Sequence, residues 1–157
     1  MPLLEPGHPA PDLELTAIGG ESVTLSTLWQ DAPTVIAFYR GDACPMCNRY
    51  LHGLQERYNE FEAAGVRIAA ISSDRPELGQ ETAARHDLSF DVLADPDRAA
   101  IDAFDVIYNE ADGHAEPAIF VVSPGGTLAY ESIVSGPLGR PSVDDVLTIA
   151  RKAGRTP

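Results

Sequence analysis

The stretch Phe38-Tyr39-Arg40-Gly41-Asp42-Ala43-Cys44-Pro45-Met46-Cys47 contains both cysteines of this 157-residue protein. An apolar run typical of a β-strand, residues 34–38, leads into this stretch. A segment with helical periodicity begins near Pro45. A Cys-x-x-Cys pair at the junction of a strand and a helix is typical of a thiol-redox site. We therefore expect Cys44 and Cys47 to be the reactive centre of a thiol-redox protein.

The composition of the chain is that of a single compact domain, residues 1–157. Its hydrophobic fraction is 44%, and the chain is long enough to bury a full core. The formal charge of −13 gives an acidic surface that repels phosphate, so we expect neither nucleic acid nor a membrane as a partner. No segment is apolar for long enough to span a bilayer, and residues 1–8 do not resemble a signal peptide. These features predict a cytoplasmic protein.

Hydrophobic periodicity along the chain predicts an α/β domain. We expect a β-hairpin around Gly19-Gly20, strands over 34–39 and 66–71, helices over 45–65 and 76–86, an extended piece at 90–93, a helix over 95–104, a surface loop over 108–116, strands over 118–122 and 127–134, and a helix beginning at 141. The unit over 34–72 is β-α-β, so its strands run parallel, whereas the last two strands form an antiparallel hairpin. The result is a mixed sheet with helices on both faces.

The spacing of the two cysteines predicts different roles for them. Cys44 lies at the cap of the helix, where unpaired backbone N–H groups stabilise a thiolate, and Pro45 suits the first helical position. Cys47 lies on the apolar stripe of the same helix, with Leu51 and Leu54. Geometry alone therefore makes Cys44 the exposed nucleophile and Cys47 the buried resolving thiol.

Charged residues near the pair predict a basic environment. Arg40, Arg49 and His52 flank it with only Asp42 opposing them, which would lower a thiol pKa. Arg40 either stabilises a thiolate or leaving group or forms an exposed salt bridge. A zinc site would need four ligands, and only scattered histidines are available, so we expect no metal or cofactor.

Other polar residues are expected to have structural or surface roles. Asp74 and Asp95 follow strands and should serve in turns or caps, although ligands often bind at that edge of an α/β sheet. His8, His86 and His114 have no partner at a suggestive spacing and are expected on the surface.

The chain also resembles the peroxiredoxin-like branch of the alkyl hydroperoxide reductase/thiol-specific antioxidant (AhpC/TSA) family, within the thioredoxin-fold superfamily. Besides the cysteine stretch, the matching motifs are Gly7-x-x-Ala10-Pro11-Asp12, Val23-x-Leu25-Ser26, Ile71-Ser72-x-Asp74, and Pro117-Ala118-x-Phe120-Val121-Val122 followed by Gly125-Gly126. The resemblance covers nearly the whole chain. It implies a thioredoxin-like fold with a central mixed sheet, flanking helices and an N-terminal β-hairpin extension.

Two departures from the family pattern concern the site. Peroxidatic members carry Thr-x-x-Cys at this turn and an arginine just before the later Phe-Val-Val strand. Alignment puts Cys44 at the threonine position, Cys47 at the peroxidatic position and Pro117 at the arginine position. Cys-x-x-Cys at the turn and a proline before this strand are both features that resemble thioredoxin-like proteins. We therefore expect Pro117 to be a cis-proline that pairs a substrate peptide beside the sulfurs. The tryptophan that often precedes such a motif is Ala43 here.

The resemblance leaves two mechanisms open. In a peroxidase, Cys47 attacks the peroxide and Cys44 condenses with the resulting sulfenic acid. In a disulfide reductase, Cys44 attacks a substrate disulfide and Cys47 resolves the mixed disulfide. Either way we expect an antioxidant oxidoreductase that cycles a Cys44–Cys47 disulfide with a thiol donor such as thioredoxin or glutathione. The alternative is a non-catalytic redox-sensing or interaction module. The sequence leaves monomer and homodimer both open.

Overall fold

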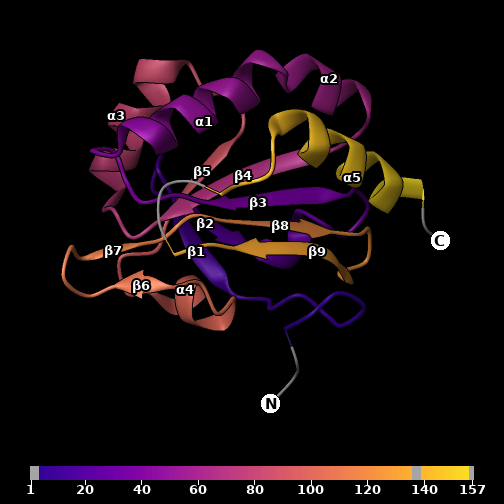
Figure 1. Cartoon of the computed structure of the whole chain (residues 1–157), viewed down its shortest axis with the longest axis horizontal. Coiled ribbons are helices and arrows are strands. Elements are labelled where there is room, and N and C mark those ends of the chain that lie inside the picture. The colour runs from indigo at the N-terminus through magenta and orange to yellow at the C-terminus, as the bar shows by residue number, and fades with distance from the viewer. Residues whose placement is uncertain (1–3, 136–138, 156–157) are drawn as a thin grey trace.

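A mixed β-sheet forms the centre of the structure, a computed structural model that describes residues 4–135 and 139–155. Its strands are β1 (Glu14–Ala17), β2 (Ser22–Thr24), β3 (Thr34–Phe38), β4 (Arg67–Ser72), β5 (Asp91–Ala94), β8 (Ala118–Val122) and β9 (Leu128–Ile133), in the order β2-β1-β5-β4-β3-β8-β9 (Figure 1). Strands β3, β4 and β5 are parallel, and the others join antiparallel. The predicted mixed sheet and N-terminal hairpin are confirmed, and the hairpin extends the sheet through β5.

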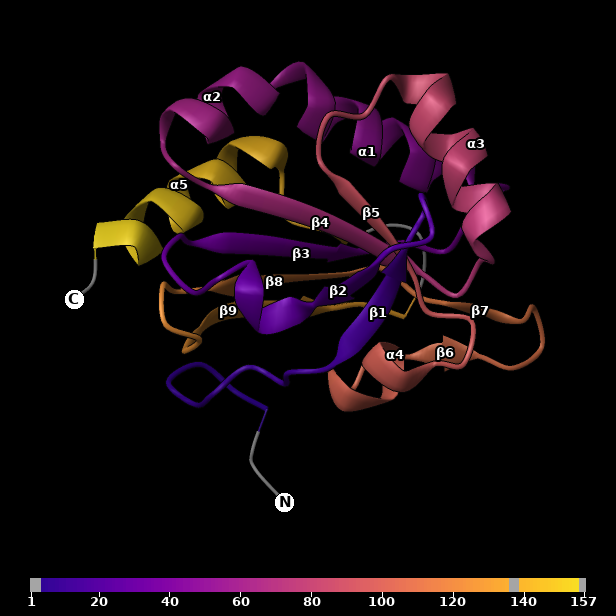
Figure 2. The same cartoon turned by 180° about the vertical axis from the view of Figure 1, so that it is seen from behind.

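Helices cover both faces of this sheet, as predicted. Helices α1 (Pro45–Glu56), α2 (Tyr58–Ala63), α3 (Pro76–His86) and α5 (Val143–Arg155) lie on one side. The short α4 (Ala99–Ala103) and a 3₁₀ turn, η1 (Leu25–Thr27), lie on the other (Figure 2). No helix in the described part of the chain is both long and apolar enough to cross a bilayer.

Strand β3 is buried on both faces because its side chains alternate between two cores. Val35 and Ala37 pack under α1 and α5, in the core that also contains Cys47. Ile36 and Phe38 face the opposite core, where aromatic rings gather. The Phe38 ring centroid lies 5.5 Å from that of Phe104. The burial on both faces fixes the strand rigidly, and the reactive turn follows directly from its carboxyl end.

Two sequence predictions about helices were wrong in their bounds. The segment expected as one helix over 45–65 is two helices that meet at Arg57. The helix expected from residue 95 begins only at Ala99, because Arg98 has a left-handed backbone (φ 64°) that a helix cannot include. The buried Asp95 instead accepts a hydrogen bond from the Ile101 N–H at 2.8 Å, which is the cap role expected for it.

The segment expected as a surface loop over 108–116 is a small β-hairpin. Its strands are β6 (Tyr108–Asn109) and β7 (His114–Ala115), which pair antiparallel. The hairpin projects at one end of the main sheet (Figures 1 and 2). Strands of two residues are too short to show the alternation from which strands are predicted. This hairpin supplies part of the candidate site.

Candidate active site

Cys44 is the N-cap of α1, in the position that the sequence predicted. Its Sγ accepts a hydrogen bond from the Cys47 N–H at 3.3 Å, and Pro45 occupies the first turn of the helix. The Cys44 side chain is partly exposed, and both cysteines are free thiols. A sulfur at a helix N-terminus that accepts a backbone N–H is well placed to carry a negative charge.

Cys47 lies behind Cys44 and is fully buried, with 0% of its surface exposed. Its Sγ accepts a hydrogen bond from the Arg40 N–H at 3.3 Å. The pKa of the Cys47 thiol is raised to about 11, first by burial and then by the neighbouring Cys44 sulfur, although the Arg40 N–H and the charge of Arg140 act in the opposite direction. The expected lowering of a thiol pKa by basic neighbours is therefore wrong for Cys47, because desolvation outweighs them.

Asn48 connects the two ends of the reactive turn. Its side-chain amide donates to the carbonyl oxygens of Asp42 and Cys44, both at 2.8 Å. Its Oδ1 lies 2.9 Å from Nε2 of His86 on α3. Because every polar atom of the Asn48 side chain has a partner, the turn from Asp42 to Cys44 is held against the first turn of α1. His86 was expected on the surface, but it is half-buried and its ring contacts Asn48.

Arg40 joins the reactive turn to the β6–β7 hairpin. Its Nη2 lies 2.8 Å from Nε2 of His114, and its Nε lies 3.6 Å from Oε1 of Glu116. Asp112 makes a further ion pair with the guanidinium at 3.6 Å. Arg40 is only 20% exposed and Glu116 only 2%, so the Arg40–Glu116 pair is shielded from solvent, unlike a surface salt bridge. The surface position expected for His114 was wrong.

The other predicted basic residues do not join Arg40. Arg49 is exposed on α1, and His52 is exposed and pairs with Glu56 one turn further along the helix. The clustering of Arg40 with His114 and Glu116 links residues more than 70 positions apart. Sequence spacing gave no signal for it, apart from the family pattern that places Pro117 just beyond Glu116.

Pro117 precedes β8 and is buried, but its peptide bond with Glu116 is trans. The expected cis-proline is therefore wrong. Its carbonyl oxygen accepts a hydrogen bond from the Val134 N–H at 3.3 Å, one residue beyond the paired strands β8 and β9. Because a residue before proline is restricted to extended conformations, Pro117 limits the backbone of Glu116, whose carboxylate faces Arg40.

A cavity of about 470 Å³ opens beside Cys44. Cys44, Pro45 and Met46 line it at the start of the helix. Arg40 and Asp74 also line it, together with Asp112 and His114 of the hairpin. Its lining therefore combines apolar side chains at the helix start with charged side chains of the turn and the hairpin. The accessible sulfur of the pair opens into a space that can hold a small molecule.

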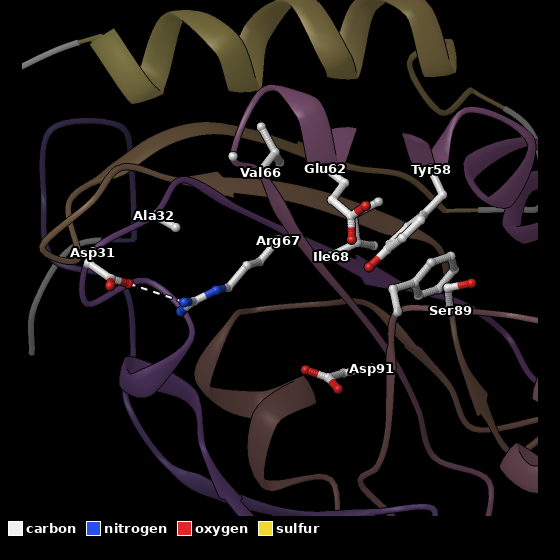
Figure 3. Close-up of a pocket in the computed structure, with 11 residues that line it drawn as sticks. Asp31, Ala32, Tyr58, Glu62, Val66, Arg67, Ile68, Ser89 and Asp91 are labelled. Carbon is white, nitrogen blue, oxygen red and sulfur yellow. Dashed lines mark ion pairs between the residues drawn. The ribbon is translucent and has the colours of Figure 1, made fainter. Parts of the chain in front are cut away.

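A larger cavity, of about 550 Å³, lies at the other end of the parallel strands (Figure 3). Arg67 and Asp91, the first residues of β4 and β5, line it, and Arg67 makes an ion pair with Asp31 at 3.3 Å. The reactive turn instead follows the carboxyl end of β3, so this cavity is remote from the dithiol. Within residues 4–135 and 139–155, no group of three or more His, Cys, Asp and Glu residues is arranged to hold a metal ion.

Comparison with known proteins gives consistent results. The profile of the AhpC/TSA family matches residues 6–131. Alkyl hydroperoxide reductase C of Staphylococcus aureus (strain NCTC 8325 / PS 47) is 29% identical over 126 residues, which is 76% of this chain. The chain spans only 62% of the length of that relative.

Solved structures show the same fold. Mycobacterium bovis AhpC superimposes with a TM-score of 0.81 at 27% identity, covering 96% of this chain and 92% of that one. The bacterioferritin comigratory protein of Xanthomonas campestris, studied for its alkyl peroxide reduction activity, superimposes with a TM-score of 0.78 at 28% identity. The superposition covers 90% of each chain. The peroxidoxin BcpB of Mycobacterium tuberculosis superimposes with a TM-score of 0.85 at 20% identity, covering 98% of this chain and 100% of that one. At this identity the similarity concerns the fold alone.

Proposed function

Because the chain belongs to the AhpC/TSA family, we propose that it is a thiol-dependent peroxide reductase in which Cys44 attacks first and Cys47 resolves. The observation that carries this order is the position of the two sulfurs. Cys44 lines the cavity and accepts the Cys47 N–H, whereas Cys47 is fully buried. The family alignment puts the peroxide-reactive position at Cys47 instead, and the raised pKa of Cys47 argues against that assignment.

The proposed cycle has three steps. The Cys44 thiolate attacks one peroxide oxygen, the O–O bond breaks, and Cys44 becomes a sulfenic acid while an alcohol or water leaves. The Cys47 thiol then attacks the Cys44 sulfur, which forms the disulfide and releases water. A donor dithiol, for which thioredoxin or two molecules of glutathione would serve, reduces this disulfide by thiol exchange and restores both thiols.

Three further residues support this chemistry. Arg40 lines the cavity and brings a positive charge toward the peroxide oxygens, where negative charge develops as the O–O bond breaks. Pro45 begins the helix whose N-terminus faces Cys44. Pro117 acts indirectly, by restricting Glu116, which holds the Arg40 side chain. We also propose that the protein works in the cytoplasm, where thiol donors keep such a pair reduced.

The reduction of disulfides is a second candidate function. It is favoured by the partial exposure of Cys44 at the rim of the cavity, which a disulfide of a peptide could reach. Cys44 would form the mixed disulfide and Cys47 would resolve it, as in peroxide reduction.

Single-cysteine variants test the proposal. Cys47→Ser retains Cys44 and should consume one equivalent of tert-butyl hydroperoxide, leaving a sulfenic acid that dimedone traps at Cys44. Cys44→Ser should not react, and neither variant should turn over with thioredoxin. If only Cys44→Ser consumes peroxide, Cys47 is the thiol that attacks the peroxide. If the wild type ignores peroxide but reduces insulin disulfides, the second function holds. If no thiol donor turns over the oxidised pair, the protein is a redox-sensing or interaction module.

A further inference from the structure

Asp74 contributes a carboxyl group to the wall of the cavity that Cys44 lines. It follows β4 at the same end of the sheet at which β3 leads into the reactive turn. The Asp42 N–H donates to Asp74 Oδ2 at 2.7 Å, so part of its role is the turn contact that the sequence predicted. A turn contact alone does not require the carboxyl group to face a cavity beside a reactive sulfur.

The carboxyl group of Asp74 packs directly against the backbone of the reactive turn. A Cβ atom on Gly41 would lie 2.9 Å from Asp74 Oδ1, which is closer than carbon and oxygen atoms approach. Gly41 also has a φ of +147°, a conformation that other residues rarely adopt. The Gly41 carbonyl oxygen in turn accepts the Cys44 N–H at 3.1 Å. Glycine at position 41 therefore lets the carboxyl group lie against the same short turn that carries Cys44.

The surroundings raise the affinity of this carboxyl group for a proton. The titratable and charged groups that face Asp74 or share its cavity are Tyr39, Arg40, Asp42, Cys44, Asp112 and His114. Burial raises the pKa of Asp74, and the charge of Asp42 raises it further, whereas the Asp42 N–H and His114 oppose the shift. Asp74 thus retains a proton at a higher pH than an exposed aspartate does.

We propose that Asp74 donates a proton to the oxygen that leaves when Cys44 attacks a hydroperoxide. This inference rests on the proposed peroxide reduction. In the attack, the Cys44 thiolate gives an electron pair to the nearer oxygen, and the farther oxygen departs with the O–O bonding pair. An alkoxide is a poor leaving group in a partly buried site, so a proton delivered as the bond breaks lowers the barrier.

The proton balance closes over the whole cycle. The first step converts the Cys44 thiolate, a hydroperoxide and the Asp74 acid into the Cys44 sulfenic acid, an alcohol and the Asp74 carboxylate. Disulfide formation with Cys47 then releases water. When a donor dithiol reduces the disulfide, one of its two protons returns to Cys47 and the other returns to Asp74, while Cys44 is restored as a thiolate.

Two oxidants with different leaving groups test this role. Tert-butyl hydroperoxide releases an alkoxide that needs a proton, whereas peracetic acid releases acetate, which does not. Asp74→Asn retains an oxygen for the Asp42 N–H but has no acidic proton. We expect it to slow oxidation by tert-butyl hydroperoxide on the order of 10²-fold and to leave oxidation by peracetic acid unchanged. Asp74→Glu should recover part of the lost rate.

The matched control is Asp91→Asn, which removes one carboxylate from the remote cavity at the other end of the sheet. It should leave both rates unchanged. A purely structural role for Asp74 predicts that Asp74→Asn slows both oxidants equally, and that result would overturn the proposal, as would equal rates for the variant and the wild type. If the wild type reduces neither oxidant, the proposed peroxide reduction fails and this role fails with it. If it reduces both and the variant does not discriminate, only the role of Asp74 fails.

Discussion

The large difference in accessibility between the two thiols leads to a sharp prediction about alkylation. When the reduced protein is treated with iodoacetamide at pH 7, Cys44 should be modified and Cys47 should remain free. Only the thiolate reacts, so the rate at each cysteine follows its ionised fraction and the access of the reagent. Peptide mapping by mass spectrometry at a series of times gives the two rates separately.

The magnitude follows from the pKa of Cys47. A thiol with a pKa of about 11 is ionised to about one part in 10⁴ at pH 7, whereas a thiol at the ordinary value of 9.0 is ionised to about one part in 10². Ionisation alone therefore slows Cys47 about 100-fold relative to an ordinary thiol, and complete burial slows it further. The rate at Cys47 should rise about tenfold for each pH unit and should level off only near pH 11.

A control in urea separates the fold from the chemistry of the reagent. In the unfolded chain both cysteines should react at similar rates, because burial and the helix N-terminus are lost. The reasoning is refuted if Cys47 is alkylated before Cys44 in the folded protein, or if its rate levels off below about pH 9. Either result would mean that Cys47 carries the more stable thiolate, and the order of attack proposed above would be reversed.

Three further predictions concern stability and are measured by urea unfolding. The pKa of Cys47 is raised from 9.0 to about 11 and that of Tyr39 from 10.0 to about 12. Both groups therefore stabilise the fold fully below pH 9, and the free energy of unfolding should fall between about pH 9 and 12; a flat profile contradicts this. Gly41→Ala should cost about 1–3 kcal/mol because of the positive φ and the close contact at that position, and a loss below about 0.5 kcal/mol would argue against this. Leu54→Ala, in the core beneath α1, should cost about 2–5 kcal/mol, whereas Leu78→Ala, at an exposed position, should cost less than about 0.5 kcal/mol; similar losses would contradict the assigned burial.

The sequence was sufficient to predict most of the sheet and the position of the reactive turn. The run Val35–Phe38 is continuously apolar because β3 is buried on both faces, and apolar residues recur every three or four positions from Cys47 because α1 buries one face. Cys44 at the cap with Pro45 behind it is a local pattern, and local patterns determine helix starts.

The parts that could not be predicted depend on contacts between distant segments. The β6–β7 hairpin has strands of two residues, and its contact with the reactive turn comes from Arg40 meeting His114 and Glu116. Hydrophobic periodicity in the sequence does not predict contacts between side chains so far apart along the chain. The pKa of Cys47 was misjudged for a related reason: sequence shows the charged neighbours of a thiol, whereas the extent of desolvation depends on the packed core.

The spacing of Cys44 and Cys47 within one helical turn has a consequence for the durability of the protein. A sulfenic acid at Cys44 would always have the resolving thiol within reach, since the Cys47 N–H already contacts the Cys44 sulfur. Disulfide formation would then compete well against attack by a second peroxide molecule, which converts a sulfenic acid irreversibly to a sulfinic acid. A reductase built in this way would keep working under a strong oxidant load, with its turnover limited by the supply of reducing thiols.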